Sequence, residues 1–114
     1  MKILCDESLK DAIRICRDYN NLEVLIFVSR AYMVKDIAKD VVRRTKNTRT
    51  AKICYGPTVY QIQFPKNSCI TIAVPNPSRR GLRGNMILVD EAIPRDTVNN
   101  VIAPYELMYD LSWD

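Results

Sequence analysis

Two adjacent carboxylates, Asp90 and Glu91, directly follow the apolar run Met86–Val89. A buried strand of a parallel sheet presents the residues after it at the carboxyl edge of the sheet, where ligands usually bind. There an aspartate can order Mg²⁺, and a glutamate can align the water that attacks a nucleoside triphosphate. Acidic residues in this position also commonly cap the next helix. The sequence therefore predicts Asp90 and Glu91 as a catalytic pair of the Walker-B type, vestigial or dependent on a partner, and leaves the capping role open.

Cationic side chains gather in two segments of the chain. The first segment holds Arg43, Arg44, Lys46, Arg49 and Lys52. Because this segment follows a helical pattern, its cations can complement the helix dipole, and in a loop they can bind phosphates. We predict a nucleic-acid-binding surface here, with a solvated loop as the alternative. The second segment holds Arg79, Arg80 and Arg83. We expect it to contact a phosphate or a partner, or to pair with Asp90 or Glu91.

The spacing of apolar residues places these groups on alternating strands and helices. Strands are expected at Lys2–Cys5, Leu22–Ser29, Thr58–Phe64, Cys69–Val74 and Met86–Asp90. Helices are expected after a capping box of Ser8 and Asp11, at Ala31–Thr45 and at Pro94–Val101. The strand-helix-strand-helix beginning predicts a mainly parallel sheet, and the turn at Pro65–Ser68 predicts one β-hairpin. We therefore predict an α/β fold, with residues 1–114 forming a single three-layer domain.

The composition excludes several kinds of chemistry. The chain has no histidine, and its four cysteines are far apart in the sequence, at positions 5, 16, 54 and 69. A zinc site and a nucleophile activated by histidine are therefore not expected, and we predict no metal site. All four cysteines are predicted to be reduced residues in or near the core.

Charge and hydropathy indicate where the protein works and what it meets. Residues 1–84 carry 16 basic and 7 acidic side chains, whereas residues 85–114 carry 1 basic and 6 acidic side chains. This asymmetry favours an acidic partner or pairing between the two parts. The longest apolar run, Val24–Val28, is too short to cross a bilayer. We expect a cytoplasmic protein with no membrane contact.

The order of motifs from Gln61 to Pro104 resembles the ATPase domain of the large subunit of viral DNA-packaging terminases. The matching segments are Ile62–Phe64, Asn67–Ile70, Leu82–Gly84, Met86–Ala92 and Val101–Pro104. Upstream, Val24–Arg30 and the helical pattern after it resemble the strand and helix that follow the phosphate-binding loop in that family. The resemblance implies a P-loop-NTPase-like fold, a viral or phage origin and a location in the host cytoplasm.

The phosphate-binding loop of that family is missing here. Its position holds Cys5–Ser8, which contains neither glycine nor lysine and adds two carboxylates that repel phosphate. We therefore expect a noncatalytic, terminase-like protein that needs no cofactor and binds DNA, RNA or an assembly partner, in genome packaging or its regulation.

Two other hypotheses stay open. In the first, a partner subunit supplies the missing loop and Mg-ATP binds. Asp90 would then order Mg²⁺, Glu91 would align water, and Arg83 would act on the γ-phosphate. In the second, the protein is purely an interaction module, such as an inhibitor of a host factor. A homo-oligomer is also possible.

Overall fold

The computed structural model describes residues 1–45, 51–56, 58–76 and 84–105, and the side chains of all of these except residues 51–55 and 105. The strands are β1 (Lys2–Ile3), β2 (Glu23–Phe27), β3 (Ala51–Gly56), β4 (Val59–Gln63), β5 (Cys69–Ala73) and β6 (Met86–Val89). The helices are α1 (Asp6–Asp18), α2 (Ala31–Arg44) and the short α3 (Arg95–Thr97), which continues as a π-helical turn, Val98–Ile102, and a 3₁₀ turn, Ala103–Tyr105.

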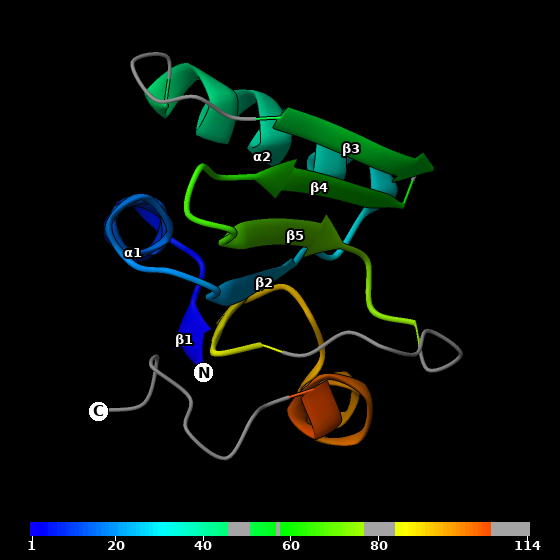
Figure 1. The fold of residues 1–114 in the computed structure, drawn as a ribbon. Coiled ribbons are helices and arrows are strands. Elements are labelled where there is room, and N and C mark those ends of the chain that lie inside the picture. Colours follow the sequence, from blue (N-terminus) through cyan, green and yellow to red (C-terminus); the bar gives the residue numbers. More distant parts are fainter. Residues whose placement is uncertain (46–50, 57, 77–83, 106–114) are drawn as a thin grey trace.

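All six strands belong to one sheet in the order β1-β6-β2-β5-β4-β3. β1, β6, β2 and β5 are parallel, with Ile26 opposite Leu88 on one side and Ile72 on the other. β5, β4 and β3 form an antiparallel meander, and Figure 1 shows these three strands beside β2. The predicted α/β class with a mostly parallel sheet is therefore confirmed.

Helices pack on both faces of the sheet. The larger core joins the apolar stripes of α1 and α2 to one face of β2, and it contains Leu9, Ala12, Ile13, Cys16, Val34, Ala38, Val41, Val24, Ile26 and Val28. On the other face, Leu25 and Phe27 of β2 pack with Ile93 and Ile102 from the α3 region, which is orange in Figure 1. Because successive strand residues point to opposite faces, the continuous apolar run of β2 serves both cores.

Two local predictions were wrong. The basic loop was expected to extend as far as Lys52, but residues Ala51–Gly56 form strand β3. The antiparallel part of the sheet therefore contains two hairpins rather than one. The first helix begins at Asp6 rather than after Ser8, because Cys5 is its N-cap. The backbone N–H of Ser8 donates to Cys5 Sγ at 3.4 Å, and the backbone N–H of Cys5 donates to Ser8 Oγ at 2.9 Å. This pair forms the capping box, instead of Ser8 and Asp11.

The cysteines are only partly as expected. Cys16 and Cys69 are free and buried, and burial raises the pKa of their thiols, to about 12 and about 11. Cys5 is free and exposed, so the prediction of a near-core position is wrong for it. Its hydrogen bonds with Ser8 lower the pKa of its thiol. The side chain of Cys54 lies outside the described residues.

Candidate functional site

The predicted catalytic pair lies at the carboxyl edge of the parallel strands, as expected. β6 ends at Val89, and the backbone N–H of Asp90 still donates to the carbonyl of Phe27, at the end of β2, at 2.9 Å. On the other side of β6, the N–H of Leu4 donates to the carbonyl of Val89 at 2.8 Å. The ends of β1, β6 and β2 are thus tied together directly at this edge.

The carboxylate of Asp90 is already engaged by its own fold. Its Oδ2 accepts from Ser29 Oγ at 2.7 Å and from the Ser29 backbone N–H at 3.2 Å, and its Oδ1 accepts from the backbone N–H of Ala92 at 3.2 Å. Partial burial disfavours the charged carboxylate, but these hydrogen bonds outweigh it and lower the pKa of Asp90. Asp90 therefore joins the end of β2 to the turn after β6 and is ionised at neutral pH. The neighbouring Glu91 is exposed.

The segment after β1, where the terminase resemblance would place a phosphate-binding loop, forms the first turn of α1. The N-terminal amide of Ser8 is used by Cys5, and Asp6 and Glu7 add two acidic side chains there. Hydrogen bonds from Arg44 and from Lys10 lower the pKa of Asp6, so this carboxylate is charged. Asp6 is paired with these two cations, and Glu7 adds a further acidic side chain at the helix start that disfavours a phosphate group there. Within the part of the chain that the structure describes, no three side chains of His, Cys, Asp or Glu form a group that could hold a metal ion.

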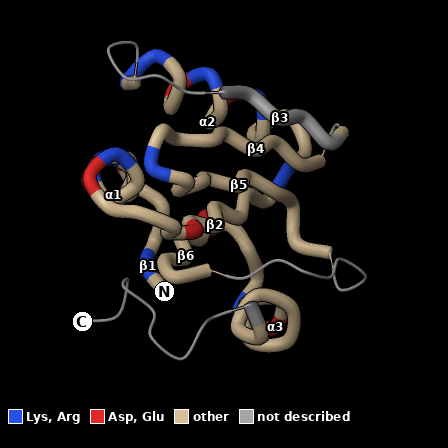
Figure 2. Tube along the Cα trace, viewed as in Figure 1, with Lys and Arg blue, Asp and Glu red and all other residues tan. Residues whose placement is uncertain are grey.

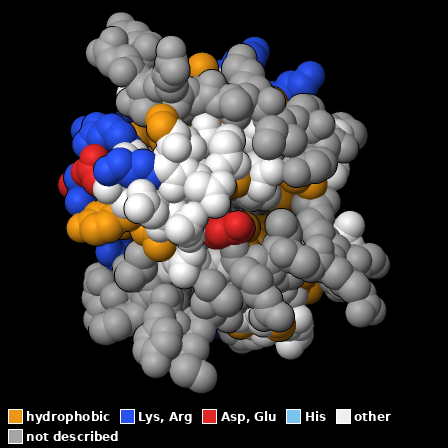
Figure 3. Space-filling model, in the orientation of Figure 1, with side chains coloured by type: hydrophobic (Ala, Val, Ile, Leu, Met, Phe, Trp, Pro, Cys, Tyr) orange, Lys and Arg blue, Asp and Glu red, His pale blue; other side chains and the backbone are white. Residues whose placement is uncertain are grey.

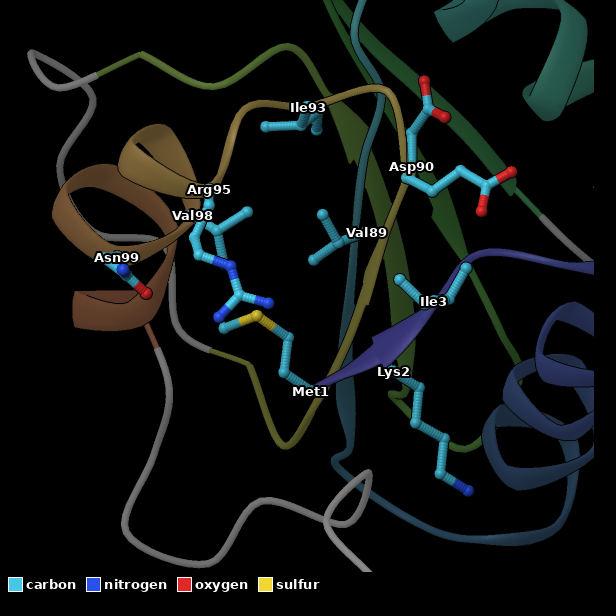
Figure 4. A pocket seen from close by; sticks show the side chains of 10 residues that line it. Met1, Lys2, Ile3, Val89, Asp90, Ile93, Arg95, Val98 and Asn99 are labelled. Atoms are coloured by element: carbon cyan, nitrogen blue, oxygen red, sulfur yellow. The ribbon is translucent and has the colours of Figure 1, made fainter.

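A cavity of about 440 Å³ lies beside this edge, between β1 and the α3 segment. Its lining includes the apolar side chains of Val89, Ile93 and Val98. In Figure 4, Arg95 extends toward Met1, whereas the carboxylate of Asp90 points away from both. Asp90 and Arg95 both line the cavity, as do Lys2 and Glu91, but the carboxylate of Asp90 and the guanidinium of Arg95 do not converge on one reacting atom.

A different surface brings cations and an aromatic ring together. A second cavity of about 440 Å³ lies between α2 and β4, and we call it the α2–β4 groove. It is lined by Lys35, Ala38, Lys39, Val42 and Arg43 of α2 and by Tyr60 of β4. Because residues four apart in a helix lie on the same face, the three cations form one row along the groove. Ala38 is buried and Val42 half-buried, so the cationic row has an apolar floor.

The cations of α1 all form ion pairs with acidic residues, whereas two cations of α2 do not, as far as the structure describes the chain. On α1, Lys10, Arg14 and Arg17 all pair with acidic residues of the same helix. Figure 3 shows these mixed charges at the left, over α1, and Figure 2 shows several basic positions along α2. Lys35 and Lys39 are exposed and form no ion pair with any residue that the structure describes.

The predicted nucleic-acid residues separate into three groups. Arg43 is at the groove, its side chain is 74% exposed, and it pairs with Asp40. Arg44 binds Asp6 of α1 and also Asp40 of its own helix, and its side chain is only 23% exposed. These bonds raise the pKa of Arg44, so it serves as a helix-helix bridge. Lys46, Arg49 and the second patch of Arg79, Arg80 and Arg83 lie outside the described residues, as does the side chain of Lys52.

Sequence reasoning missed Lys35, Lys39 and Tyr60 as members of a site. The spacing of Lys35 and Lys39 with Arg43 was available as a signal, but it predicts only the solvent face of an amphipathic helix. Nothing in the sequence places Tyr60 beside that face, because this depends on how α2 packs over β4.

Comparison of the chain with models of protein families, with curated proteins and with solved structures finds no match. Among the described residues, no helix combines the length and the apolar character that crossing a bilayer requires.

Proposed function

We propose that this chain is a noncatalytic protein that binds nucleic acid through the α2–β4 groove. The observation that carries the proposal is the row of Lys35, Lys39 and Arg43 beside Tyr60, over an apolar floor. Phosphates supply most of the affinity in protein–nucleic acid complexes, and their partners are lysine and arginine side chains that no acidic neighbour already neutralises. Lys35 and Lys39 meet this condition within the described part of the chain.

The arrangement at the carboxyl edge supports the noncatalytic part of the proposal. Phosphoryl transfer depends on a cradle for the phosphates and on metal ions that neutralise their charge. Here the oxygens of Asp90 accept three hydrogen bonds from the fold, and Asp6 and Glu7 occupy the helix start where a cradle would lie. The proposal accordingly assigns no nucleotide cofactor to the chain.

The terminase-like ancestry belongs to the same proposal. Its support is the order of motifs from Gln61 to Pro104, together with an α/β sheet in which the Asp-Glu strand lies between β1 and β2. A reduced relative of a packaging motor that binds nucleic acid without hydrolysing nucleotide would act in genome packaging or in its regulation, in the host cytoplasm.

The number of cations sets the expected salt dependence. Counterion release gives a slope of log K against log salt of about −0.7 to −0.9 per phosphate contact. Two contacts, made by Lys35 and Lys39, then predict that affinity falls about 7- to 12-fold between 50 and 200 mM salt. Losing both lysines should remove most of this salt dependence and weaken binding by roughly 25- to 60-fold at 0.1 M salt.

Fluorescence anisotropy with a labelled oligonucleotide tests these values. The variant is Lys35→Gln combined with Lys39→Gln, and the matched control is Arg14→Gln combined with Arg17→Gln, which removes the same charge from α1. The control should bind within about twofold of the unaltered chain, since Arg14 and Arg17 do not line the α2–β4 groove. Equal loss in both variants would mean that net charge alone drives binding, and absence of binding to the unaltered chain would end the proposal.

A further inference from the structure

We infer that the α2–β4 groove selects single-stranded over duplex nucleic acid, by holding an unpaired base against Tyr60. This inference rests on the proposed function, because it concerns the ligand of the same groove. It adds a chemical distinction that the cations alone cannot make, since phosphates are present in single and double strands alike.

Tyr60 stands on the α2 side of the sheet. Side chains of β4 alternate between the two faces of the sheet. Val59 packs into the core under α3, whereas Tyr60 and Ile62 belong to the core under α2. Ile62 is fully buried, but Tyr60 is only half-buried and lines the groove. Tyr60 is therefore packed against the core and is still partly accessible where it lines the groove.

The groove combines a slot for an apolar ring with a cationic rim. Ala38 and Val42 supply the apolar floor, and the volume of about 440 Å³ lies within the roughly 300–1,000 Å³ of small-molecule sites. A nucleobase fits this combination because it is a flat aromatic ring attached to a phosphate backbone. Its face can stack on Tyr60 while the adjoining phosphates meet Lys35 and Lys39.

A duplex cannot use the same slot without breaking a base pair. Its bases are stacked inside the helix, and it presents phosphates and sugars to a surface such as α2. It would therefore engage the cations but leave Tyr60 and the apolar floor without a partner. A single strand can turn one base outward at much lower cost, which is how aromatic side chains recognise unpaired nucleotides.

A second exposed ring supports a single strand running along α2. Tyr32 is 70% exposed and lies three residues before Lys35, so both residues share one helix face. Along this part of α2 the exposed ring of Tyr32 precedes the cations Lys35, Lys39 and Arg43, with exposed Asp36 among them and Tyr60 beside the row. Aromatic rings interleaved with cations are typical of surfaces that track single strands, where rings stack bases and cations follow phosphates. An acidic peptide would complement the cations but would give the two rings no comparable partner.

The test compares one labelled oligonucleotide as a single strand and as a duplex, in anisotropy titrations with three proteins: the unaltered chain, Tyr60→Phe and Tyr60→Leu. A stacked base accounts for about a 5- to 150-fold difference in affinity. The single strand should bind more tightly than the duplex by a factor in that range. Tyr60→Phe should keep this preference, whereas Tyr60→Leu should abolish it without changing the salt slope, because the phosphate contacts remain.

A crosslinking measurement keeps the result independent of any loss of folding in Tyr60→Leu. A strand carrying 5-iodouracil is irradiated on the unaltered chain, and the attachment site is found by mass spectrometry. Attachment to Tyr60 supports the inference, and attachment confined to other residues overturns it. Equal binding of the duplex, unaffected by Tyr60→Leu but weakened by Lys35→Gln and Lys39→Gln, also overturns it while leaving the proposed function intact.

Two further outcomes are distinct. If neither form of nucleic acid binds, the proposed function itself fails and the inference fails with it. If poly-glutamate displaces the strand as effectively as unlabelled strand does, and its binding depends equally on Tyr60, the groove is a site for acidic peptides and the inference is overturned.

Discussion

Replacing Asp90 should destabilise the protein. Replacing a catalytic carboxylate usually has the opposite effect on stability. Polar groups gathered for catalysis commonly reduce stability, so removing one of them often stabilises an enzyme. Here the carboxylate of Asp90 accepts hydrogen bonds from the Ser29 hydroxyl, the Ser29 amide and the Ala92 amide. Removing it leaves two backbone N–H groups without an acceptor at the point where β2 and β6 end.

The magnitude follows from the number and type of these bonds. Hydrogen bonds to a charged group contribute about 1.5–3 kcal/mol, and water replaces part of this where the site is only partly buried. We therefore expect Asp90→Ala to lower the free energy of unfolding by about 2–3 kcal/mol, which corresponds to a fall in Tm of roughly 8–15 °C for a chain of this size. Asp90→Asn should cost about 1–2 kcal/mol, because its amide keeps one oxygen as an acceptor but loses the charge.

The dependence on pH gives this prediction a second check. The pKa of Asp90 is lower in the folded protein than its value of about 3.9 in an unfolded chain. The stabilisation is therefore complete above about pH 4 and is lost as the pH falls through the folded-state pKa. The difference in stability between the unaltered chain and Asp90→Asn should be constant at neutral pH and shrink in acid.

Urea unfolding followed by circular dichroism measures these differences. Glu91→Gln is the control, since Glu91 is exposed, and it should change stability by less than about 0.5 kcal/mol. A double-mutant cycle with Ser29→Ala should give a coupling of about 1 kcal/mol between Ser29 and Asp90. If Asp90→Asn is as stable as the unaltered chain or more stable, the interpretation of Asp90 as a structural bridge is refuted.

Two other predictions concern local packing and thiol chemistry. A Cβ added at Gly84 would lie 2.9 Å from Cγ1 of Ile87, so Gly84→Ala should destabilise the fold by about 1–3 kcal/mol in the same urea experiment; a neutral effect would show that the side chain can move aside. Iodoacetamide should modify Cys5 long before Cys16, because Cys5 is exposed with a lowered thiol pKa whereas burial raises the pKa of Cys16 to about 12. Ser8→Ala should shift the pH profile of Cys5 alkylation, followed by mass spectrometry, to higher pH, and an unchanged profile would contradict the role given to Ser8.

The parts of the fold that the sequence could predict are those decided locally. The apolar runs at Val24–Val28 and Met86–Val89 do form parallel strands, because strands covered on both faces need no polar alternation. β3 was missed because its six residues combine apolar and cationic side chains and have no clear period of two. It is an edge strand that exists through pairing with β4, with Ala51 opposite Gln63, and such pairing is not encoded within the strand itself.

The candidate sites also combine features that the local sequence predicts with features that depend on residues distant in the chain. The position of Asp90 at the strand end follows from the motif, but its role depends on Ser29, which is 61 residues away in the chain. Likewise the sequence contains the row of Lys35 and Lys39, but only the packing of α2 over β4 places Tyr60 beside it. In both cases a residue type and its spacing predict what chemistry is available, while distant partners decide whether that chemistry is free for a ligand.

The carboxyl edge of the sheet, with Asp90, and the α2–β4 groove are both next to helix α2. Ser29 donates two hydrogen bonds to Asp90 and directly precedes Arg30. The carbonyl of Arg30 accepts from the N–H of Met33 in the first turn of α2. The bridge at the carboxyl edge therefore ends one residue before Arg30, the N-cap of α2. Asp90 does not line the α2–β4 groove. Well below its Tm, Asp90→Asn should therefore bind an oligonucleotide as tightly as the unaltered chain, and the two should diverge only as the variant unfolds. Loss of affinity in the fully folded variant would instead place Asp90 in the binding site and move the functional centre back to the carboxyl edge of the sheet.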